Sequence, residues 1–223
     1  MDVKNFALIL YILTVILATT AVAFGNDTLR LFSNPVVIPA ITFYYIFDRI
    51  EKFSVYYGLV LFLCFAVDTL VFLELDVVLY IMVPSFLCYL ILFYFIIQDL
   101  RGFKFNKIGF AFSIIIFSAL LFLLINILKS LAVTIPKLVV PGFIYGLFLI
   151  LFASFGIYYF LVNRNAVAKY LLFFILLSLF SDIFYVVFKL ITSLRSLVYI
   201  EFSAQLISYY FLVKYFSNRK VLD

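Results

Sequence analysis

The sequence predicts an all-α integral membrane protein, a bundle of eight transmembrane helices. Hydrophobic residues make up 68% of the chain and charged residues only 12%, about half the charged fraction of an ordinary soluble domain. The apolar residues form unbroken blocks close to the roughly 20 residues that cross a hydrocarbon core. Blocks such as residues 108–128 lack the polar–apolar alternation of barrel strands. Because lipid offers the backbone no hydrogen-bond partners, we expect helices.

Short polar breaks divide the chain into its predicted spans. They place the spans at residues 6–24, 31–47, 53–73, 77–98, 108–128, 138–162, 167–188 and 194–216. The linkers are short, so we expect a single transmembrane domain over residues 1–223. Such a chain leaves no room for a soluble catalytic domain, and any chemistry must sit within the helices or at their ends. The first apolar block lacks a small-residue cleavage site, so we expect it to be a retained span.

The distribution of basic residues predicts the orientation. Of the 16 Lys and Arg residues, only Arg30, Lys129, Lys137, Lys189 and Arg195 fall on the side of the odd-numbered loops. The other basic residues lie at the two termini and in the even-numbered loops, which predicts that both termini are cytoplasmic. The formal charge of +5 is scattered over short loops. That scatter suits an anionic membrane surface and excludes a nucleic-acid partner.

Two residue types limit the available chemistry. The chain has no histidine, which removes the commonest metal ligand and general base. Cys64 and Cys88 fall near mid-membrane in adjacent predicted spans; a disulfide or a metal pair would be conceivable there, but buried apolar thiols are the better interpretation. We therefore expect no metal and no cofactor.

The informative residues are carboxylic acids inside the apolar blocks, because ionisable groups are costly in a bilayer and usually functional. Asp68 lies late in the third span, Asp182 lies past the middle of the seventh, and Glu201 lies in the first third of the eighth. With the predicted orientation, all three carboxyl groups sit in the outer half of the membrane at similar depth.

Helical spacing extends these acids into polar faces. The face of the seventh span holds Ser178, Ser181, Asp182, Tyr185 and Lys189, and that of the eighth holds Glu201, Gln205, Ser208 and Tyr209. Asn34, Asn126 and Lys137 lie near the same membrane surface. We expect these helices to enclose a polar cavity that opens toward the outer leaflet. The alternative is that the carboxylates only bridge helices through hydrogen bonds to Ser, Tyr or Lys.

Two carboxyl groups in such a cavity suit acid–base chemistry. Burial and mutual repulsion favour the protonated form of one group, while its neighbour stays ionised, helped by Lys137 or Lys189. One protonated and one ionised carboxyl group form a general acid and a general base.

Short motifs across residues 33–216 resemble the YhhN family, bacterial relatives of eukaryotic lysoplasmalogenase. They are Ser33-Asn34-Pro35, Asp68 late in the third span, Pro141-Gly142-Phe143-Ile144-Tyr145, Ser181-Asp182 and Ala204-Gln205, in eight spans of similar length. Three positions depart from the family pattern. Asn34 replaces a Lys, Val67 replaces a Gly, and Cys88-Tyr89 occupies the region where the family has a His.

The resemblance implies hydrolysis of the vinyl ether bond of lysoplasmalogens, in a bacterial inner membrane. It implies that Asp68 and Asp182 are the catalytic acid and base, in an order that the motifs leave open. The substrate-binding residues expected around them are Asn34, Lys137, Tyr145, Ser181, Tyr185, Lys189, Glu201 and Gln205. The partner is then a lysophospholipid or another single-chain lipid, which enters sideways from the bilayer.

Two other functions remain open from the sequence. A lipid-binding or scaffold protein of the same fold, without activity, agrees with the missing histidine. A small proton-coupled transporter also agrees with intramembrane carboxylates, although Gly-interrupted half-helices are not evident. A retinal protein is disfavoured, because no Lys lies mid-span in the last helices.

Overall fold

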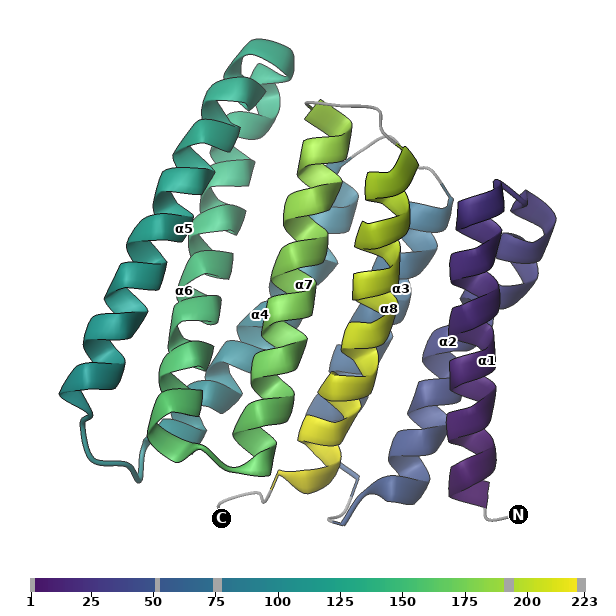
Figure 1. Cartoon of the computed structure of the whole chain (residues 1–223), viewed down its shortest axis with the longest axis horizontal. Coiled ribbons are helices and arrows are strands. Elements are labelled where there is room, and N and C mark those ends of the chain that lie inside the picture. The colour runs from purple at the N-terminus through teal and green to yellow at the C-terminus, as the bar shows by residue number, and fades with distance from the viewer. Residues whose placement is uncertain (1–2, 51–52, 74–77, 191–194, 220–223) are drawn as a thin grey trace.

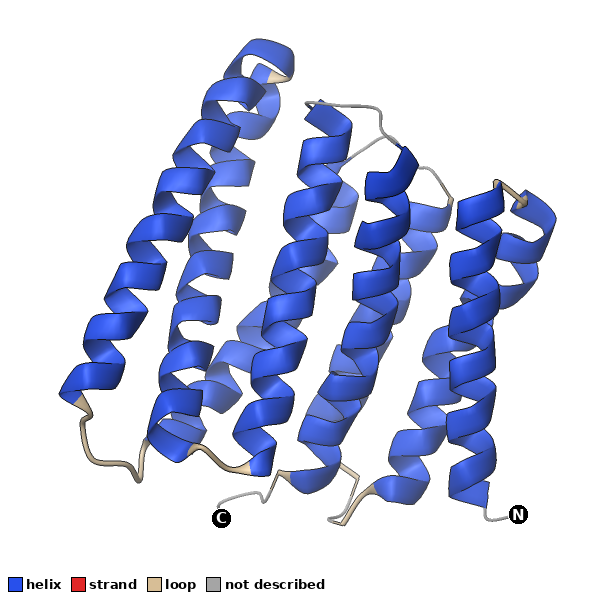
Figure 2. Cartoon of the chain, viewed as in Figure 1, coloured by secondary structure: helices blue, strands red, loops and turns tan. Residues whose placement is uncertain are grey.

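The computed structural model describes residues 3–50, 53–73, 78–190 and 195–219, with the side chains of residues 189, 190 and 195 left out. Within these ranges the chain is helical and contains no strand (Figure 2). The helices are α1 (Val3–Phe24), α2 (Asp27–Asp48), α3 (Val55–Phe72), α4 (Val78–Leu100), α5 (Lys107–Thr134), α6 (Val139–Asn163), α7 (Ala166–Leu190) and α8 (Arg195–Asn218). A short 3₁₀ turn, η1 (Pro136–Leu138), precedes α6.

All eight helices are long and apolar enough to cross a membrane. The shortest, α3, has 18 residues and the longest, α5, has 28, against the roughly 20 that a bilayer core requires. The predicted class of an all-α, multi-pass membrane protein is therefore confirmed.

Most helices extend slightly beyond the predicted spans, and α2 and α5 extend farthest. Helix α2 begins at Asp27, not at residue 31, because the side chain of Asn26 accepts a hydrogen bond from the Leu29 amide at 3.0 Å and caps the first turn. Helix α5 continues past the exposed Lys129 and ends at Thr134, not at residue 128. Pro136 then disfavours helical geometry at Ile135, which takes φ −140° and ψ 75°.

Six helices form a closed ring (Figure 1). Around it, each of α2, α3, α4, α6, α7 and α8 packs against the next, and α8 closes the ring on α2. Helix α1 packs outside against α2 and α8, and α5 packs outside against α6 and α7. The start of α1 and the end of α8 lie at the same end of the bundle, which we call the terminal end.

A partly buried ionic cluster joins three helices at the terminal end. Asp48, the last residue of α2, accepts a hydrogen bond from Lys214 of α8 at 3.0 Å and forms an ion pair with Lys4 of α1. Lys214 also donates to the hydroxyl group of Tyr44 at 3.2 Å. Because a charge removed from water needs partners, this cluster holds α1 and α8 against α2.

A second buried cluster ties the end of α8 to α4. The Arg219 Nε donates to both carboxylate oxygens of Asp99, at 2.9 and 3.1 Å. Its other nitrogens donate to Tyr57 and Gln98, and Tyr215 donates to Asp99 at 3.0 Å. Burial, the largest single influence, lowers the pKa of Arg219, but the hydrogen bonds to Asp99 and Tyr57 and the nearby negative charge together outweigh it and raise that pKa. Paired charges thus stabilise the packing of the helices at the terminal end.

Candidate functional site

A cavity of about 270 Å³ lies in the half of the bundle away from the terminal end. Its lining comes from α2 through α8, and no described residue of α1 contributes to it. Acids enter it from three elements: Asp68 from the last turns of α3, Asp182 from α7 and Glu201 from the second turn of α8. The structure therefore brings together the three carboxyl groups that the sequence placed at similar depth.

Most of the cavity wall is apolar, and a large share of its apolar lining comes from α5, α6 and α7. Helix α5 contributes Leu120, Leu123, Leu124, Ile127, Leu128 and Leu131, and α6 contributes Gly142, Gly146, Leu149 and Ile150. A Cβ placed on Gly146 would lie 2.4 Å from Leu124 Cδ1. With glycine at this position, the Leu124 side chain packs directly on the α6 backbone.

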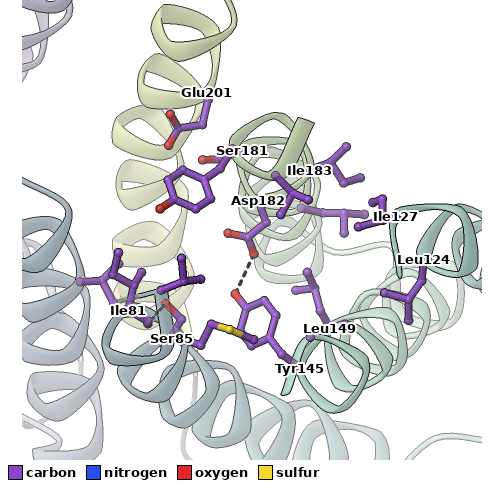
Figure 3. A pocket seen from close by; sticks show the side chains of 18 of the residues that line it. Ile81, Ser85, Leu124, Ile127, Tyr145, Leu149, Ser181, Asp182, Ile183 and Glu201 are labelled. Carbon is purple, nitrogen blue, oxygen red and sulfur yellow. Dashed lines mark hydrogen bonds between the residues drawn. The ribbon is translucent and has the colours of Figure 1, made fainter. Parts of the chain in front are cut away.

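Asp182 receives two phenol hydroxyl groups on one oxygen atom. Tyr89 of α4 donates to its Oδ2 at 2.9 Å, and Tyr145 of α6 donates to the same atom at 3.0 Å. Figure 3 shows Asp182 and Tyr145 pointing toward one another, with Glu201 and Ser181 on the far side of the carboxyl group. Two donors on one carboxylate oxygen fix the position of Asp182 and stabilise its negative charge.

Asp68 is held by a second hydrogen-bonded chain that comes from α8. The hydroxyl group of Tyr209 donates to Asp68 Oδ1 at 2.6 Å. The oxygen of the same hydroxyl group accepts a hydrogen bond from Gln205 Nε2 at 3.0 Å. The phenol oxygen thus accepts from the Gln205 amide, and the Tyr209 proton points at the carboxyl group.

Eight of the ten sequence-predicted site residues line this cavity: Asn34, Asp68, Tyr145, Ser181, Asp182, Tyr185, Glu201 and Gln205. Among the described residues, Asn34 Oδ1 is buried and has no hydrogen-bond partner. An amide oxygen without a partner is expensive in an apolar interior, so Asn34 is suited to meet a polar group inside the cavity.

Lys137 does not reach the cavity. It lies in η1 after Pro136, where its side chain is exposed, and only its neighbours Ile135 and Leu138 line the cavity. The prediction rested on the position of Lys137 near the same membrane surface, which does not determine where its side chain points. The exposed position is favourable, because a charged amine is more stable in water. The other predicted lysine, Lys189, has a side chain outside the described part of the structure.

Tyr89 and Tyr209 are site residues that the prediction left out of the binding set. Tyr209 belonged to the polar face of the eighth span, but without an assigned role. The chain contains 17 Tyr and 31 Phe residues, most of them expected to face lipid or pack, so no local signal separates these two. Their partners identify them, because each donates to a carboxyl group from another helix.

Cys64 and Cys88 are buried, free thiols whose Sγ atoms lie 3.8 Å apart. This confirms the interpretation of buried thiols. No three His, Cys, Asp or Glu side chains gather as a metal site would need within the described ranges. The polar groups available at the cavity are therefore carboxyl, phenol, amide and hydroxyl groups, which can donate, accept and transfer protons.

The class that fold and cavity define is a polytopic helical membrane protein with acidic groups in an intramembrane cavity. The chain matches no family model, no curated protein and no solved structure.

Proposed function

We propose that the protein is an integral membrane hydrolase that cleaves the vinyl ether bond of lysoplasmalogen-type lysolipids. The observation that carries this proposal is the placement of Asp68 and Asp182 on one largely apolar cavity, each with its own phenol donors. An acid and a base beside an apolar chamber within membrane-spanning helices suit a substrate that is itself an amphiphile.

The lining of the cavity supports a single-chain lipid. The cavity volume of about 270 Å³ lies just below the range of ligand pockets, about 300–1,000 Å³. The wall between α5, α6 and α7 would hold part of an aliphatic chain, gaining about 0.8 kcal/mol for each buried methylene group. Glu201, Gln205, Asn34 and Tyr185 would then meet the glycerol backbone and water at the polar side.

The hydrolysis balances with two carboxyl groups and one water molecule. The protonated carboxyl group transfers its proton to the β-carbon of the vinyl ether, which leaves an oxocarbenium ion. Water attacks the carbon bonded to the ether oxygen while the ionised carboxylate takes its proton, and a hemiacetal forms. In the collapse of the hemiacetal, the carboxyl group that took the water proton gives it to the ether oxygen, and the carbon–oxygen bond breaks. The hemiacetal hydroxyl group gives its proton to the other carboxylate, which releases a fatty aldehyde and a glycerophospho-alcohol and restores both carboxyl groups to their starting states.

The hydrogen bonds suggest which carboxyl group plays each role. Asp182 accepts from two hydroxyl groups on Oδ2, which stabilises an ionised carboxylate. Asp68 accepts from one hydroxyl group, that of Tyr209, among the described residues. We therefore assign the general base and charge stabiliser to Asp182 and the general acid to Asp68. Tyr89, Tyr145 and Tyr209 act as positioning residues.

The resemblance to the YhhN family motifs agrees with this proposal, and so does a cytoplasmic location of both termini in a bacterial inner membrane. The start of α1 and the end of α8 lie at one end of the bundle, as an even number of spans requires. A green fluorescent protein fused to the C-terminus should fluoresce in a bacterial host, whereas alkaline phosphatase fused there should be inactive. The reverse pattern would overturn the orientation.

The activity is tested by incubating the purified protein in detergent with a lysoplasmalogen and measuring aldehyde release. Two matched lysolipids serve as controls, one with a saturated alkyl ether and one with an acyl ester. We expect aldehyde from the vinyl ether alone, because only that bond yields an oxocarbenium ion on protonation. Binding of all three lipids without release of any product would instead identify a lipid-binding protein.

A further inference from the structure

A second, smaller cavity of about 20 Å³ adjoins the first one. The two share Val67, Ser85, Tyr89 and Gln205 as lining residues. Cys64, Cys88, Phe174 and Ser178 complete the small cavity, which thus lies between α3, α4, α7 and α8. Neither Asp68 nor Asp182 lines it.

Two buried polar atoms at this small cavity have no hydrogen-bond partner among the described residues. They are Ser178 Oγ on α7 and Gln205 Oε1 on α8. Ser178 is 1% exposed. Leaving a buried hydroxyl or amide oxygen unsatisfied costs about 1–3 kcal/mol for each group, and such groups in native proteins are nearly always satisfied by protein or by ordered water.

We propose that this cavity binds one ordered water molecule, which bridges Ser178 Oγ and Gln205 Oε1. A water needs about 10–15 Å³ of cavity and two to four polar partners, and the cavity supplies both. Bulk lipid could not satisfy either atom. A ligand much larger than a water molecule does not fit a space of about 20 Å³.

The bridge acts on Asp68 through the side chain of Gln205. The Gln205 amide nitrogen donates to the hydroxyl oxygen of Tyr209, and Tyr209 donates to Asp68. A water that donates to Gln205 Oε1 holds the amide in this orientation. The direction of these hydrogen bonds can also reverse, so that a protonated Asp68 donates to Tyr209 and Tyr209 donates to Gln205 Oε1. The water then accepts a hydrogen bond from the Gln205 amide nitrogen. The water therefore lets Asp68 gain or lose a proton without leaving a buried group unsatisfied.

The water site stands on geometry alone, whereas its role at Asp68 rests on the proposed hydrolase. An experimental structure that resolves ordered water should show one peak within hydrogen-bond distance of both Ser178 Oγ and Gln205 Oε1. In Ser178→Val the added methyl groups should remove that peak, and in Ser178→Ala it should weaken. A Ser178 hydroxyl bonded to its own helix, with no peak beside Gln205 Oε1, would overturn the proposal.

Ser154 offers a matched control for these variants. It is buried in α6 and its Oγ is also without a partner among the described residues, but it lines neither cavity. We expect Ser178→Val to lower kcat about tenfold with KM unchanged, and Ser154→Val to leave kcat unchanged. Equal kcat values in both variants would overturn the role at Asp68. A protein without hydrolase activity would fail the aldehyde assay and still show the water peak.

Discussion

The hydroxyl group of Tyr209 donates to Asp68 Oδ1 at 2.6 Å, across 141 positions of the sequence. This bond joins α8 to α3 from opposite parts of the chain, in the half of the bundle that holds the cavity. Asp182, which accepts hydrogen bonds from Tyr89 and Tyr145, lines the same cavity as Asp68. The two carboxyl groups are thus oriented by separate sets of phenol donors, and each set can be altered without touching the other.

Replacement of Tyr209 by Phe should lower kcat with little change in KM. The variant loses the hydroxyl group that orients Asp68 and that stabilises its carboxylate as the proton leaves. A hydrogen bond to a charged group contributes about 1.5–3 kcal/mol, so we expect kcat to fall about tenfold to a hundredfold. Steady-state aldehyde release measures it. Tyr210→Phe is the control, because Tyr210 stacks on Tyr44 and does not line the cavity. A parental kcat in Tyr209→Phe would exclude this role.

Hydrolysis in D₂O should place one deuterium on carbon 2 of the released aldehyde. The proposed acid protonates that carbon, and its proton exchanges with solvent between turnovers. Mass spectrometry after rapid reduction of the aldehyde to the alcohol gives the label. An authentic aldehyde incubated with the protein in D₂O controls for later exchange. An aldehyde without the label would show that the bond breaks by another route.

Substitution of Gly142 by Leu should reduce the accepted chain length. A Cβ at this position would lie 3.6 Å from Leu131 Cδ1, an ordinary contact, so Gly142→Ala should retain activity and serves as the control. A leucine extends farther among the lining residues. If it displaces about two methylene groups, at about 0.8 kcal/mol each, KM for a long-chain lysolipid rises about tenfold. Short-chain substrates should be unaffected, and an equal effect on both chain lengths would place the chain elsewhere.

Loss of Arg219 should destabilise the fold without altering the cavity. Removing one partner of a buried ion pair costs about 3–5 kcal/mol, so Arg219→Ala should lower the thermal midpoint in detergent by roughly 10 °C. Asp99→Asn, which breaks the same pair from the other side, should lower it by a comparable amount. Arg101→Ala is the control, since Arg101 is exposed in the turn after α4. Equal midpoints for Arg219→Ala and Arg101→Ala would show that the pair contributes nothing.

The span pattern was predictable from the sequence because lipid requires long apolar blocks, and these are visible without any tertiary information. Helix ends were less predictable. The cap at Asn26 and the continuation of α5 past Lys129 depend on individual side chains that a block pattern ignores. The order of the helices around the ring was not predictable from the sequence. These helices are apolar both where they face lipid and where they face protein, so no apolar face distinguishes the packed side.

Part of the site was predictable for a related reason. Asp68, Asp182 and Gln205 stand out because polar groups are costly in an apolar span. Tyr89 and Tyr209 do not stand out, since a phenol ring packs as readily as it donates. The opposite error occurs at Lys137. Its position along the chain predicts a residue of the cavity, whereas its side chain is exposed and is not part of the lining.

The most direct test of the account compares aldehyde release from a lysoplasmalogen by the parent protein, by Asp68→Asn and by Asp182→Asn. Both substitutions keep the side-chain shape and remove the titratable group. General acid–base catalysis contributes about 10²–10⁴-fold, so turnover should fall at least about a hundredfold in each variant while the lysolipid still binds. Parental turnover in either folded variant would contradict a hydrolase that works through these two carboxyl groups.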